Sequence, residues 1–513
     1  MRYRTIFNIG VAMTALAFAS SSASAQWNAA NDEANRQRMM AEMRASDAAN
    51  DRANQESQRR FNDNAARASA SSSSSGSSTS SGSSGSSFSP SIHSSAPSGP
   101  RSIVATYSFT VHRQESPTAL VARLEQEALG GNALSAFNLG RIRYTGFDDL
   151  PRDDAAARRW FAQAAKLGHA GGQGQLGYML HDGIGGAPDP VAALDWLKKA
   201  ADQGDSYGEA LYGFYRISAA PTDRPVDLGP EIAYLIRAAD HGQLVAQAAL
   251  GMVVYGLGHG APADPGKAAH YTRMAAEQDY PEAEAELANS YIYGKGVPKD
   301  DGQAVAWLRK AVAVGNARAL RLYGRLMLEG RGVQQDPTAG AALIKRAADA
   351  GDMPAAGLYG VLLQQGFGVA KDEAAGALLL AKAAEAHDGD AEQNYAVAFF
   401  NGQGVAQDEA KGVAWQKRAA DDGNIDAVAT YAVRLSTGQG VAKDPVAGVR
   451  YARIAADAGR ARGQACLAWA YHDGAGVPKD MAQARDLFRK AAAQGDTGAI
   501  DALKLPELAA IAG

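Results

Sequence analysis

Cysteine is almost absent from this 513-residue sequence, in which Cys466 is the only one. A lone cysteine cannot form a disulfide within its own chain, so stability must come from packing. Cys466 lies in a predicted helix without an adjacent His/Asp arrangement, which favours a buried structural thiol over a nucleophile. The nine histidines are scattered, and neither H-x-x-x-H nor C-x-x-C spacing occurs. The sequence therefore predicts no metal site, no cofactor and no catalytic residue.

Long apolar runs are missing after the first 25 residues. Within residues 1–25, Arg2 and Arg4 precede a short apolar stretch, residues 6–19, and residues 23–25 read Ala-Ser-Ala. This pattern predicts a secretory signal peptide, with an uncleaved anchor as the less favoured alternative. We expect an exported protein without a transmembrane segment after cleavage, periplasmic in a Gram-negative cell and otherwise extracellular.

An excess of basic charge is also absent. The chain has 51 Lys and Arg against 55 Asp and Glu, a net charge of −4, and loss of two arginines with the signal leaves about −6. A nucleic-acid-binding surface needs a basic patch or stripe, so no nucleic-acid partner is predicted.

A glycine tract of the form Gly-x-Gly-Val, with an aspartate soon after it, is abundant instead. The first glycines of six such tracts are 36 residues apart every time: Gly294, Gly330, Gly366, Gly402, Gly438 and Gly474. A fixed period of this size indicates a repeat array. The tracts follow helical patterns rather than strands and lack the G-K-[ST] ending of a phosphate-binding loop, so they predict turns.

The residues around one tract show what each repeat is. A helical pattern, residues 319–328, ends at Gly330, because glycine tolerates the positive φ of a helix C-terminus. Asp336 is a good N-cap and Pro337 a good first residue for a second helix, which ends near Gly351. The unit is therefore helix A, a glycine turn, helix B and a short turn. One such hairpin cannot bury its apolar face alone, so neighbouring units must stack.

The pattern A-x-x-x-L/Y-G/A-x-x-Y-x-x-G-x-G-V-x-x-D, followed by a helix ending A-A-x-x-G, resembles the Sel-one-like repeat of the tetratricopeptide-like α-solenoids. Its Leu-Gly position is held by Leu139-Gly140, Leu176-Gly177, Leu287-Ala288 and Tyr323-Gly324. The resemblance implies an all-α, right-handed α/α superhelical solenoid of about ten helix-turn-helix repeats. It also implies a role like that of similar repeat proteins, which act as adaptors in assemblies and signalling.

The rest of the chain divides by composition into five segments after the signal. We expect a polar, possibly helical tail at 26–68, a disordered Ser/Gly-rich linker at 69–100, a strand and capping helix at 101–132, ten repeats at 133–495, and a capping helix at 496–513 that breaks near Pro506. The tail could oligomerise the chain or simply be solvated.

The early units are less regular than the later ones, and the first, which has Gly146, lacks the second turn glycine. In the third, residues 218–227 replace the glycine turn with a Pro-containing loop, and the fourth has one extra residue in helix A.

Two positions of helix A vary between repeats while the framework positions recur. This variation is what a recognition surface would show, and drift at solvent-facing positions would produce it too. The candidate partner-binding residues at these positions are Arg325, Phe400, Trp469 and His472. We expect helix A to line the concave face and the protein to be a non-enzymatic scaffold or regulator in the cell envelope, which binds a protein or peptide there. The alternative is an enzyme or enzyme accessory acting on peptidoglycan or polysaccharide, which would need a paired-carboxylate cleft.

Overall fold

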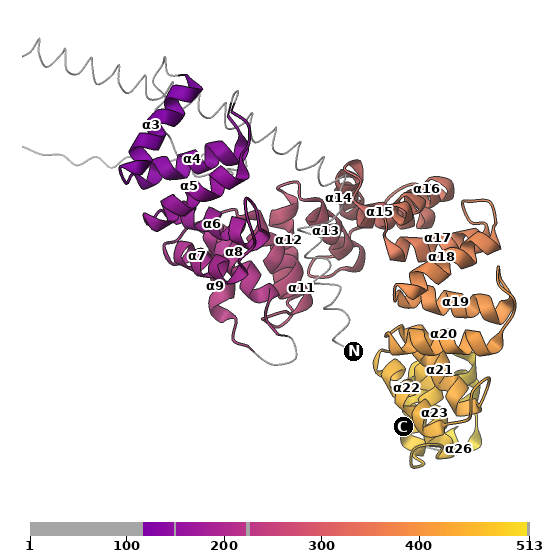
Figure 1. Ribbon diagram of the computed structural model, residues 1–513. Coiled ribbons are helices and arrows are strands. Elements are labelled where there is room, and N and C mark those ends of the chain that lie inside the picture. Colours follow the sequence, from indigo (N-terminus) through magenta and orange to yellow (C-terminus); the bar gives the residue numbers. More distant parts are fainter. Residues whose placement is uncertain (1–115, 148–149, 222–225, 510–513) are drawn as a thin grey trace, which may run out of the picture. The chain divides into compact units, whose positions relative to one another are not determined.

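The computed structural model describes residues 116–147, 150–221 and 226–509 (Figure 1). The expectations for the signal peptide, the tail at 26–68, the linker at 69–100 and the strand near 103–111 lie outside the described residues. The chain divides into two compact units, the first ending at Pro262 and the second beginning at Ala263, and each is described by itself.

The first unit is built from α-helices that follow one another as hairpins. They are α3 (Pro117–Leu129), α4 (Ala133–Thr145), α5 (Asp154–Lys166), α6 (Ala170–Asp182), α7 (Pro190–Asp202), α8 (Ser206–Ser218), α9 (Gly229–Asp240), α10 (Leu244–Ala248), the π-helix η1 (Ala249–Val254) and α11 (Tyr255–Leu257).

The second unit continues the same alternation. Its helices are α12 (Pro265–Ala276), α13 (Pro281–Tyr293), α14 (Asp301–Ala313), α15 (Ala317–Glu329), α16 (Pro337–Asp349), α17 (Met353–Gln365), α18 (Glu373–Glu385), α19 (Gly389–Asn401), α20 (Glu409–Asp421), α21 (Ile425–Thr437), α22 (Pro445–Asp457), α23 (Ala461–Asp473), α24 (Met481–Ala492), α25 (Thr497–Ala502) and α26 (Pro506–Ala509).

The predicted all-α solenoid is confirmed. Within each unit, A helices pack against the B helix of the same repeat and against the B helix before it, and A helices also contact the next A helix, as α6 does α8 and α21 does α23. The described residues contain one isolated antiparallel bridge, between Phe147 and Leu150, and no longer strand pairing.

The turn chemistry predicted around Asp336 is also confirmed. Gly330 ends α15 with φ of 68°, and the Asp336 carboxylate accepts the Ala339 amide hydrogen at 2.9 Å at the start of α16. The second glycine of the tract serves a different purpose. A side chain at Gly404 would collide with the Glu373 carbonyl at the start of the preceding B helix, so this glycine sets how closely two repeats approach.

The two irregular repeats differ from the regular ones where the sequence predicted. The sequence between α8 and α9, residues 219–228, contains no glycine, and α9 has no side-chain cap. The extra residue of the fourth unit is absorbed by η1, where the backbone widens to a π-helical turn for six residues.

Small residues form most of the core. Alanines near the end of each B helix, such as Ala347, Ala383 and Ala419, are completely buried, which allows the next A helix to approach closely. A large aromatic residue recurs half-buried in the middle of helix B, and in several repeats a basic side chain three residues later lies over its ring, as Lys310 does over Trp307 at 4.8 Å.

The two ends of the described chain carry additional helices. Ser116 caps α3, which packs on α4. After α24, the expected C-terminal helix is two short ones, α25 and α26, and the second begins at Pro506. Leu508 of α26 is fully buried in the last hydrophobic cluster, so this end closes the core.

Candidate functional site

Four tyrosines and one histidine form a row across three consecutive A helices of the first unit. Tyr144 lies on α4, Tyr178 and His181 lie on α6, and Tyr207 and Tyr215 lie on α8. The rings of His181 and Tyr215 stack with centroids 3.6 Å apart, and Tyr178 meets Tyr207 edge-on at 6.3 Å. All five side chains are half-buried, and we call this set the tyrosine row.

Burial keeps the hydroxyl groups of Tyr178 and Tyr215 in the tyrosine row protonated. Burial first, and then the neighbouring tyrosines and Asp182, raise the pKa of Tyr178 and Tyr215 above the ordinary tyrosine value. Both phenols are protonated at neutral pH, with Tyr178 hydrogen-bonded to Tyr144 and Tyr215 to Asp182. Asp182 also lies 2.6 Å from Nδ1 of His181, and the Arg152 guanidinium lies 4.8 Å from the Tyr144 ring centroid. Rigid, amphipathic tyrosines of this kind dominate the energetics of protein interfaces.

A second cluster lies in the second unit and contains two acids. Glu392 on α19 is completely buried, and Asp422, at the C-terminus of α20, is nearly so. Arg418 Nε lies 2.7 Å from Glu392, and His387 Nδ1 lies 2.7 Å from Asp422 and 3.9 Å from Glu392. Neither oxygen of Glu392 accepts a well-aligned hydrogen bond. Burial, followed by the charge of Asp422, raises the pKa of Glu392 to about 7.

The same place in other repeats is occupied by a pair of glutamines. Gln203 donates to Gln173 at 2.6 Å, and Gln494 donates to Gln464 at 2.8 Å. Glu392 and Asp422 thus replace a neutral pair with two acids, and Arg418 supplies a positive charge. The imidazole and carboxylate groups of this cluster are of the kind that ligate metal ions, but the guanidinium of Arg418 already pairs with the Glu392 carboxylate, where a metal ion would bind.

Two turn residues signal this kind of cluster in the sequence, and our sequence reasoning missed them. Residues with positive φ between helix B and helix A are glycines in the other repeats: Gly168, Gly204, Gly242, Gly315, Gly351, Gly423, Gly459 and Gly495. His387 (φ 62°) and Asp279 (φ 58°) take this place in two repeats, and each precedes a buried glutamate by five residues, Glu392 and Glu284. A positive φ raises the backbone energy of a non-glycine residue. Each of these two exceptions could therefore have indicated a favourable interaction of its side chain.

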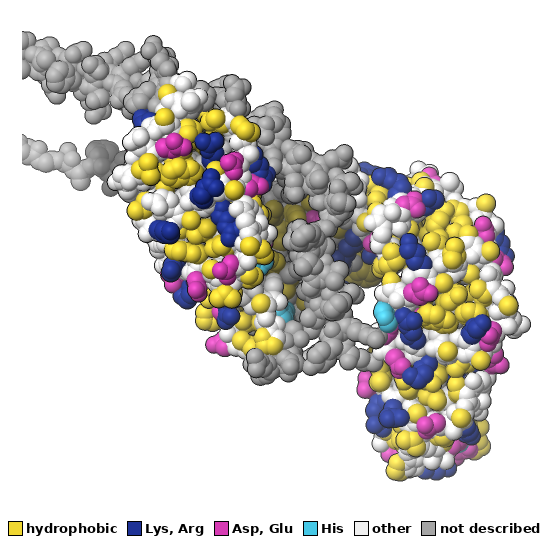
Figure 2. Space-filling view, in the orientation of Figure 1, with side chains coloured by type: hydrophobic (Ala, Val, Ile, Leu, Met, Phe, Trp, Pro, Cys, Tyr) yellow, Lys and Arg dark blue, Asp and Glu magenta, His cyan; other side chains and the backbone are white. Residues whose placement is uncertain are grey.

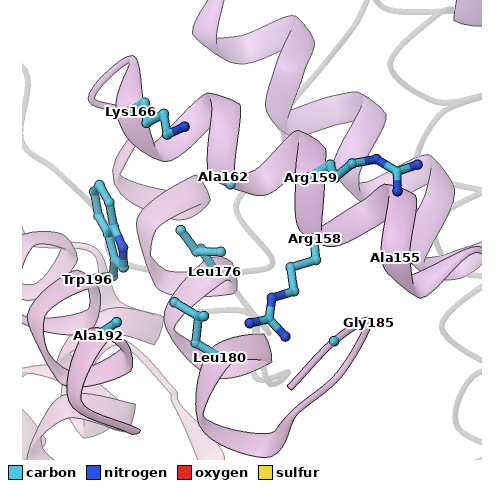
Figure 3. Close-up of a pocket in the computed structure, with 11 residues that line it drawn as sticks. Ala155, Arg158, Arg159, Ala162, Lys166, Leu176, Leu180, Gly185, Ala192 and Trp196 are labelled. Carbon is cyan, nitrogen blue, oxygen red and sulfur yellow. The ribbon is translucent and has the colours of Figure 1, made fainter. Parts of the chain in front are cut away.

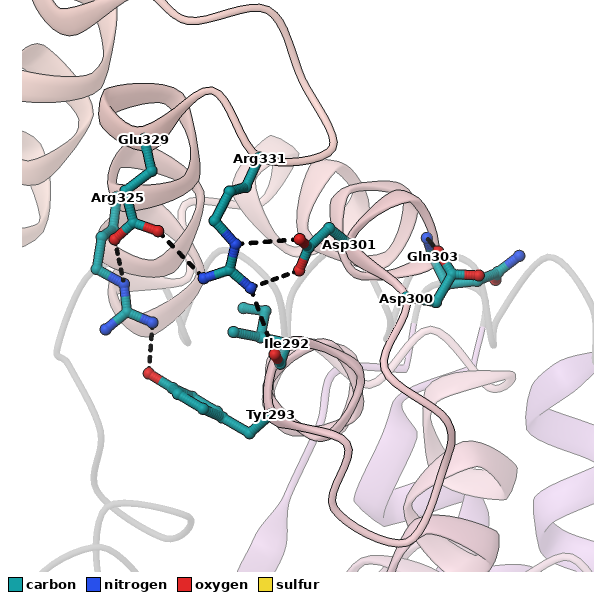
Figure 4. A network of polar contacts seen from close by, with 8 residues as sticks. All are labelled: Ile292, Tyr293, Asp300, Asp301, Gln303, Arg325, Glu329 and Arg331. Atoms are coloured by element: carbon teal, nitrogen blue, oxygen red, sulfur yellow. Dashed lines mark hydrogen bonds and ion pairs between the residues drawn. The ribbon is translucent and has the colours of Figure 1, made fainter. Parts of the chain in front are cut away.

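The predicted residue Arg325 is engaged within the array (Figure 4). It donates a hydrogen bond to the hydroxyl of Tyr293 at the end of α13, and its Nε lies 3.6 Å from Glu329. Glu329 also pairs with Arg331, whose guanidinium binds Asp301 at 2.6 Å. This network ties the end of α15 to α13 and α14, so Arg325 has an evident structural role.

Phe400 is likewise engaged within its repeat. Its ring packs on Gly412 of α20, and the guanidinium of Arg434 lies over it at 4.3 Å. Other residues at the Phe400 position are buried in the same way: Ile292, Leu328 and Gln364. In these repeats the position faces the small fourth residue of helix B.

Trp469 and His472 are the two candidates that the structure brings together. They lie on one face of α23 with ring centroids 5.3 Å apart, and Trp469 is 39% exposed. His472 lies 2.6 Å from Asp473 and 3.3 Å from Glu507 of α26. No contact in the described part of the chain joins this pair to Arg325 or Phe400, and partner binding by all four residues stays a prediction.

On the face seen in Figure 2, hydrophobic, basic and acidic side chains are interspersed. None of the described helices has the length and apolar character needed to cross a bilayer.

Comparison with known proteins adds a family match over most of the array. The family model described as "Sel1 repeat" matches residues 133–169, 170–205, 244–280, 281–316, 317–352, 354–388, 389–424, 426–459 and 461–496. The unmatched segment between the second and third matches corresponds to α8 and α9, the repeat with the irregular turn.

Two solved structures are among those similar to this chain. One is a protective antigen present in uropathogenic Escherichia coli strains and displaying an SLR fold, 25% identical over 74% of this chain and 89% of that chain, with a TM-score of 0.47. The other is a Sel1 repeat protein from Oxalobacter formigenes, 29% identical over 61% of this chain and 89% of that chain, with a TM-score of 0.41.

Proposed function

Because the chain belongs to the Sel1 repeat family, whose stacked helix pairs generally serve as protein-interaction scaffolds, we propose that it is a non-enzymatic scaffold for a protein or peptide partner. The partner binds the A helices, and the protein acts in the cell envelope. The location rests on the signal-peptide pattern of residues 1–25.

The tyrosine row is the observation that supports this function. It crosses α4, α6 and α8, so one bound segment can contact three repeats at once. Half-buried aromatic rings lose little conformational entropy on binding, so the rings of Tyr178 and Tyr215 can pack against apolar side chains of a peptide. Trp469 and His472 offer a second contact on α23, as the sequence suggests.

A site-specific photocrosslinker tests the proposed face. p-Benzoylphenylalanine replaces Tyr178 in the full chain, and in a matched control it replaces Tyr234, which lies on the B helix α9 of the same unit. Irradiation in cells should yield a defined crosslinked partner from position 178 and little or none from position 234. Equal crosslinking from both positions, or none from position 178, would contradict the proposed face.

Affinity for the crosslinked partner then tests the residues. Tyr178→Ala and Tyr215→Ala should each weaken binding by roughly 1–3 kcal/mol, as truncation of an interface aromatic does. Tyr234→Ala should leave it unchanged. The affinities of Trp469→Ala and Arg325→Ala are measured in parallel. Trp469→Ala tests the second contact on α23, and Arg325→Ala tests whether Arg325 contributes to binding in addition to its structural role. Mass analysis of the mature N-terminus and cell fractionation test export.

A further inference from the structure

A pocket opens in the first unit, on a different helix layer from the tyrosine row (Figure 3). Its volume is about 470 Å³, within the range of ligand-binding pockets. Residues of the B helices α5 and α7, of α6 and of the turn after α6 line it, and none of these residues is acidic. The side chains that give the pocket its chemistry are Arg158, Leu176, Leu180 and Trp196.

Helix α5 lacks an ion pair that other B helices carry. Nine positions after the capping residue, most B helices have a basic side chain, which in three of them pairs with an acid four positions further on: Lys198 with Asp202, Lys345 with Asp349 and Lys417 with Asp421. The same two positions of α5 hold Ala162 and Lys166, and both residues line the pocket. The small alanine leaves room at the pocket, and a lysine stands where those helices have the acid.

Arg158 is a second difference between α5 and the other B helices. Five positions after the capping aspartate, six other B helices have a buried alanine or valine: Ala269, Val305, Ala341, Ala377, Val413 and Val449. Helix α5 has Arg158 there, and its guanidinium lies on the side of Leu180 in Figure 3. The guanidinium donates to the carbonyl oxygens of Ile184 and Ala187, at 3.4 and 2.8 Å, so the turn after α6 holds it in place.

The charge of Arg158 is left for a ligand to neutralise. Both carbonyl partners are neutral, and Arg158 forms no ion pair with an acid in the part of the chain that the structure describes. A guanidinium has more N–H groups than these two bonds use, and a carboxylate accepts two of them in parallel. Arg159 and Lys166 are exposed, and the Arg159 guanidinium points away from the leucines in Figure 3. One fixed cation matches a singly charged anion better than a phosphate ester, which carries about −1.5 to −2.

The rest of the pocket is mainly apolar. Leu176 is buried and Leu180 half-buried, and the indole of Trp196 lies beside both in Figure 3. Two leucines and one indole give an apolar surface for one ring or a short branched chain. An apolar lining with a single placed charge is the usual composition of a small-molecule site.

We propose that this pocket binds a small amphipathic carboxylate, an acid whose apolar part is one ring or a short aliphatic chain. The carboxylate pairs with Arg158, and the apolar part packs on Leu176, Leu180 and Trp196. This small-molecule site is separate from the partner-binding face proposed above.

Fluorine NMR with the full chain tests this proposal. The probe is 4-(trifluoromethyl)phenylacetate, which should bind saturably with a Kd of about 1 mM or below, and more weakly as salt rises. Two controls each lack one half of it: 4-(trifluoromethyl)phenylacetamide has no charge, and trifluoroacetate has no apolar ring. Each control should bind about tenfold more weakly or worse, because it loses either the ion pair or the apolar contact.

Protein variants assign the binding to the pocket. Arg158→Gln should weaken binding of the probe at least about tenfold, because it removes the fixed charge. Arg159→Gln is the matched control, the same substitution one residue further along α5, and should change the affinity less than about twofold. Ala162→Phe keeps Arg158 and fills the space beside it, so it should also reduce binding about tenfold. This variant tests the pocket even if Arg158→Gln lowers the melting temperature.

Three outcomes would overturn the proposal. The first is no saturable binding of the probe, and the second is wild-type affinity in both Arg158→Gln and Ala162→Phe. The third is tighter binding of 4-(trifluoromethyl)phenyl phosphate than of the carboxylate, which would show that the pocket takes a phosphate ester instead. None of these outcomes depends on the crosslinking at Tyr178, so the two proposals fail separately.

Discussion

Arg418 Nε lies 2.7 Å from the carboxylate of Glu392, and that carboxylate is wholly inside the protein. Asp422, His387 and Asp388 are the other ionisable groups near it, and the acids raise its pKa further. One arginine therefore faces two buried acids, and protonation of Glu392 relieves the excess negative charge. The cluster joins α19 to α20, so its protonation should influence the stability of the array.

Stability should fall as pH rises through the titration of Glu392. Its ordinary value of 4.5 applies to the unfolded chain, and its folded pKa is about 7. Between these values the folded protein retains a proton that the unfolded chain has lost, so the free energy of unfolding decreases with pH, by up to roughly 3 kcal/mol. Melting followed by circular dichroism from about pH 4.5 to about pH 8 measures this decline.

Glu392→Gln removes this titration and restores the polar type found at Gln464. Its melting temperature should decline less with pH than that of the wild type. Burial also raises the pKa of Glu284 to about 7, so Glu284→Gln should remove a further part of the decline in melting temperature with pH. Glu409→Gln, at an exposed position on α20, is the control. An unchanged pH profile in Glu392→Gln would show that this carboxyl titrates as an ordinary glutamate.

Gly412→Ala should destabilise the array by about 1–3 kcal/mol, the usual penalty for overpacking a core. The new methyl group would collide with the ring of Phe400. Adding Phe400→Ile should recover most of the lost stability. Three repeats earlier the same pair of positions holds an isoleucine and an alanine, Ile292 and Ala304, and both are buried. Urea unfolding of the two single variants and the double variant measures the coupling, and additive losses would contradict the contact.

Asp336→Ala should cost about 1 kcal/mol, since it removes the acceptor for the Ala339 amide at the start of α16. Asp336→Asn should retain most of the stability, because an asparagine oxygen accepts the same hydrogen bond. Thermal melts of both variants provide the comparison. Equal losses in the two would mean that the charge of Asp336, rather than its capping, is what matters.

Cys466 should react slowly with Ellman's reagent in the folded protein. Burial raises the pKa of its thiol, and Sγ lies 3.6 Å from Oγ of Ser436. A smaller thiolate fraction and restricted access should reduce the rate by more than about tenfold relative to the chain in denaturant. Reaction of the folded chain as fast as the denatured one would refute a structural thiol.

The sequence was sufficient to predict the helix pairs because their limits are set locally. Gly330 and Asp336 act through their own backbone neighbours, so their roles follow from residue type and spacing. The environment of Leu328 could not be predicted from residue type and spacing. The contacts of a helix A position depend on how helix B of the same repeat lies across it. The pocket at Arg158 could not be predicted either, since three successive helices and a turn form it only after stacking.

The wide turn of η1 has a consequence for how such a chain can change in length. A residue inserted into a helix would normally rotate everything beyond it by about 100° and misalign all later contacts. Here six residues from Ala249 to Val254 absorb the surplus, and α12 still begins at an aspartate cap, Asp264. A one-residue insertion is thus accommodated within its own repeat, and the following repeats keep their own spacing.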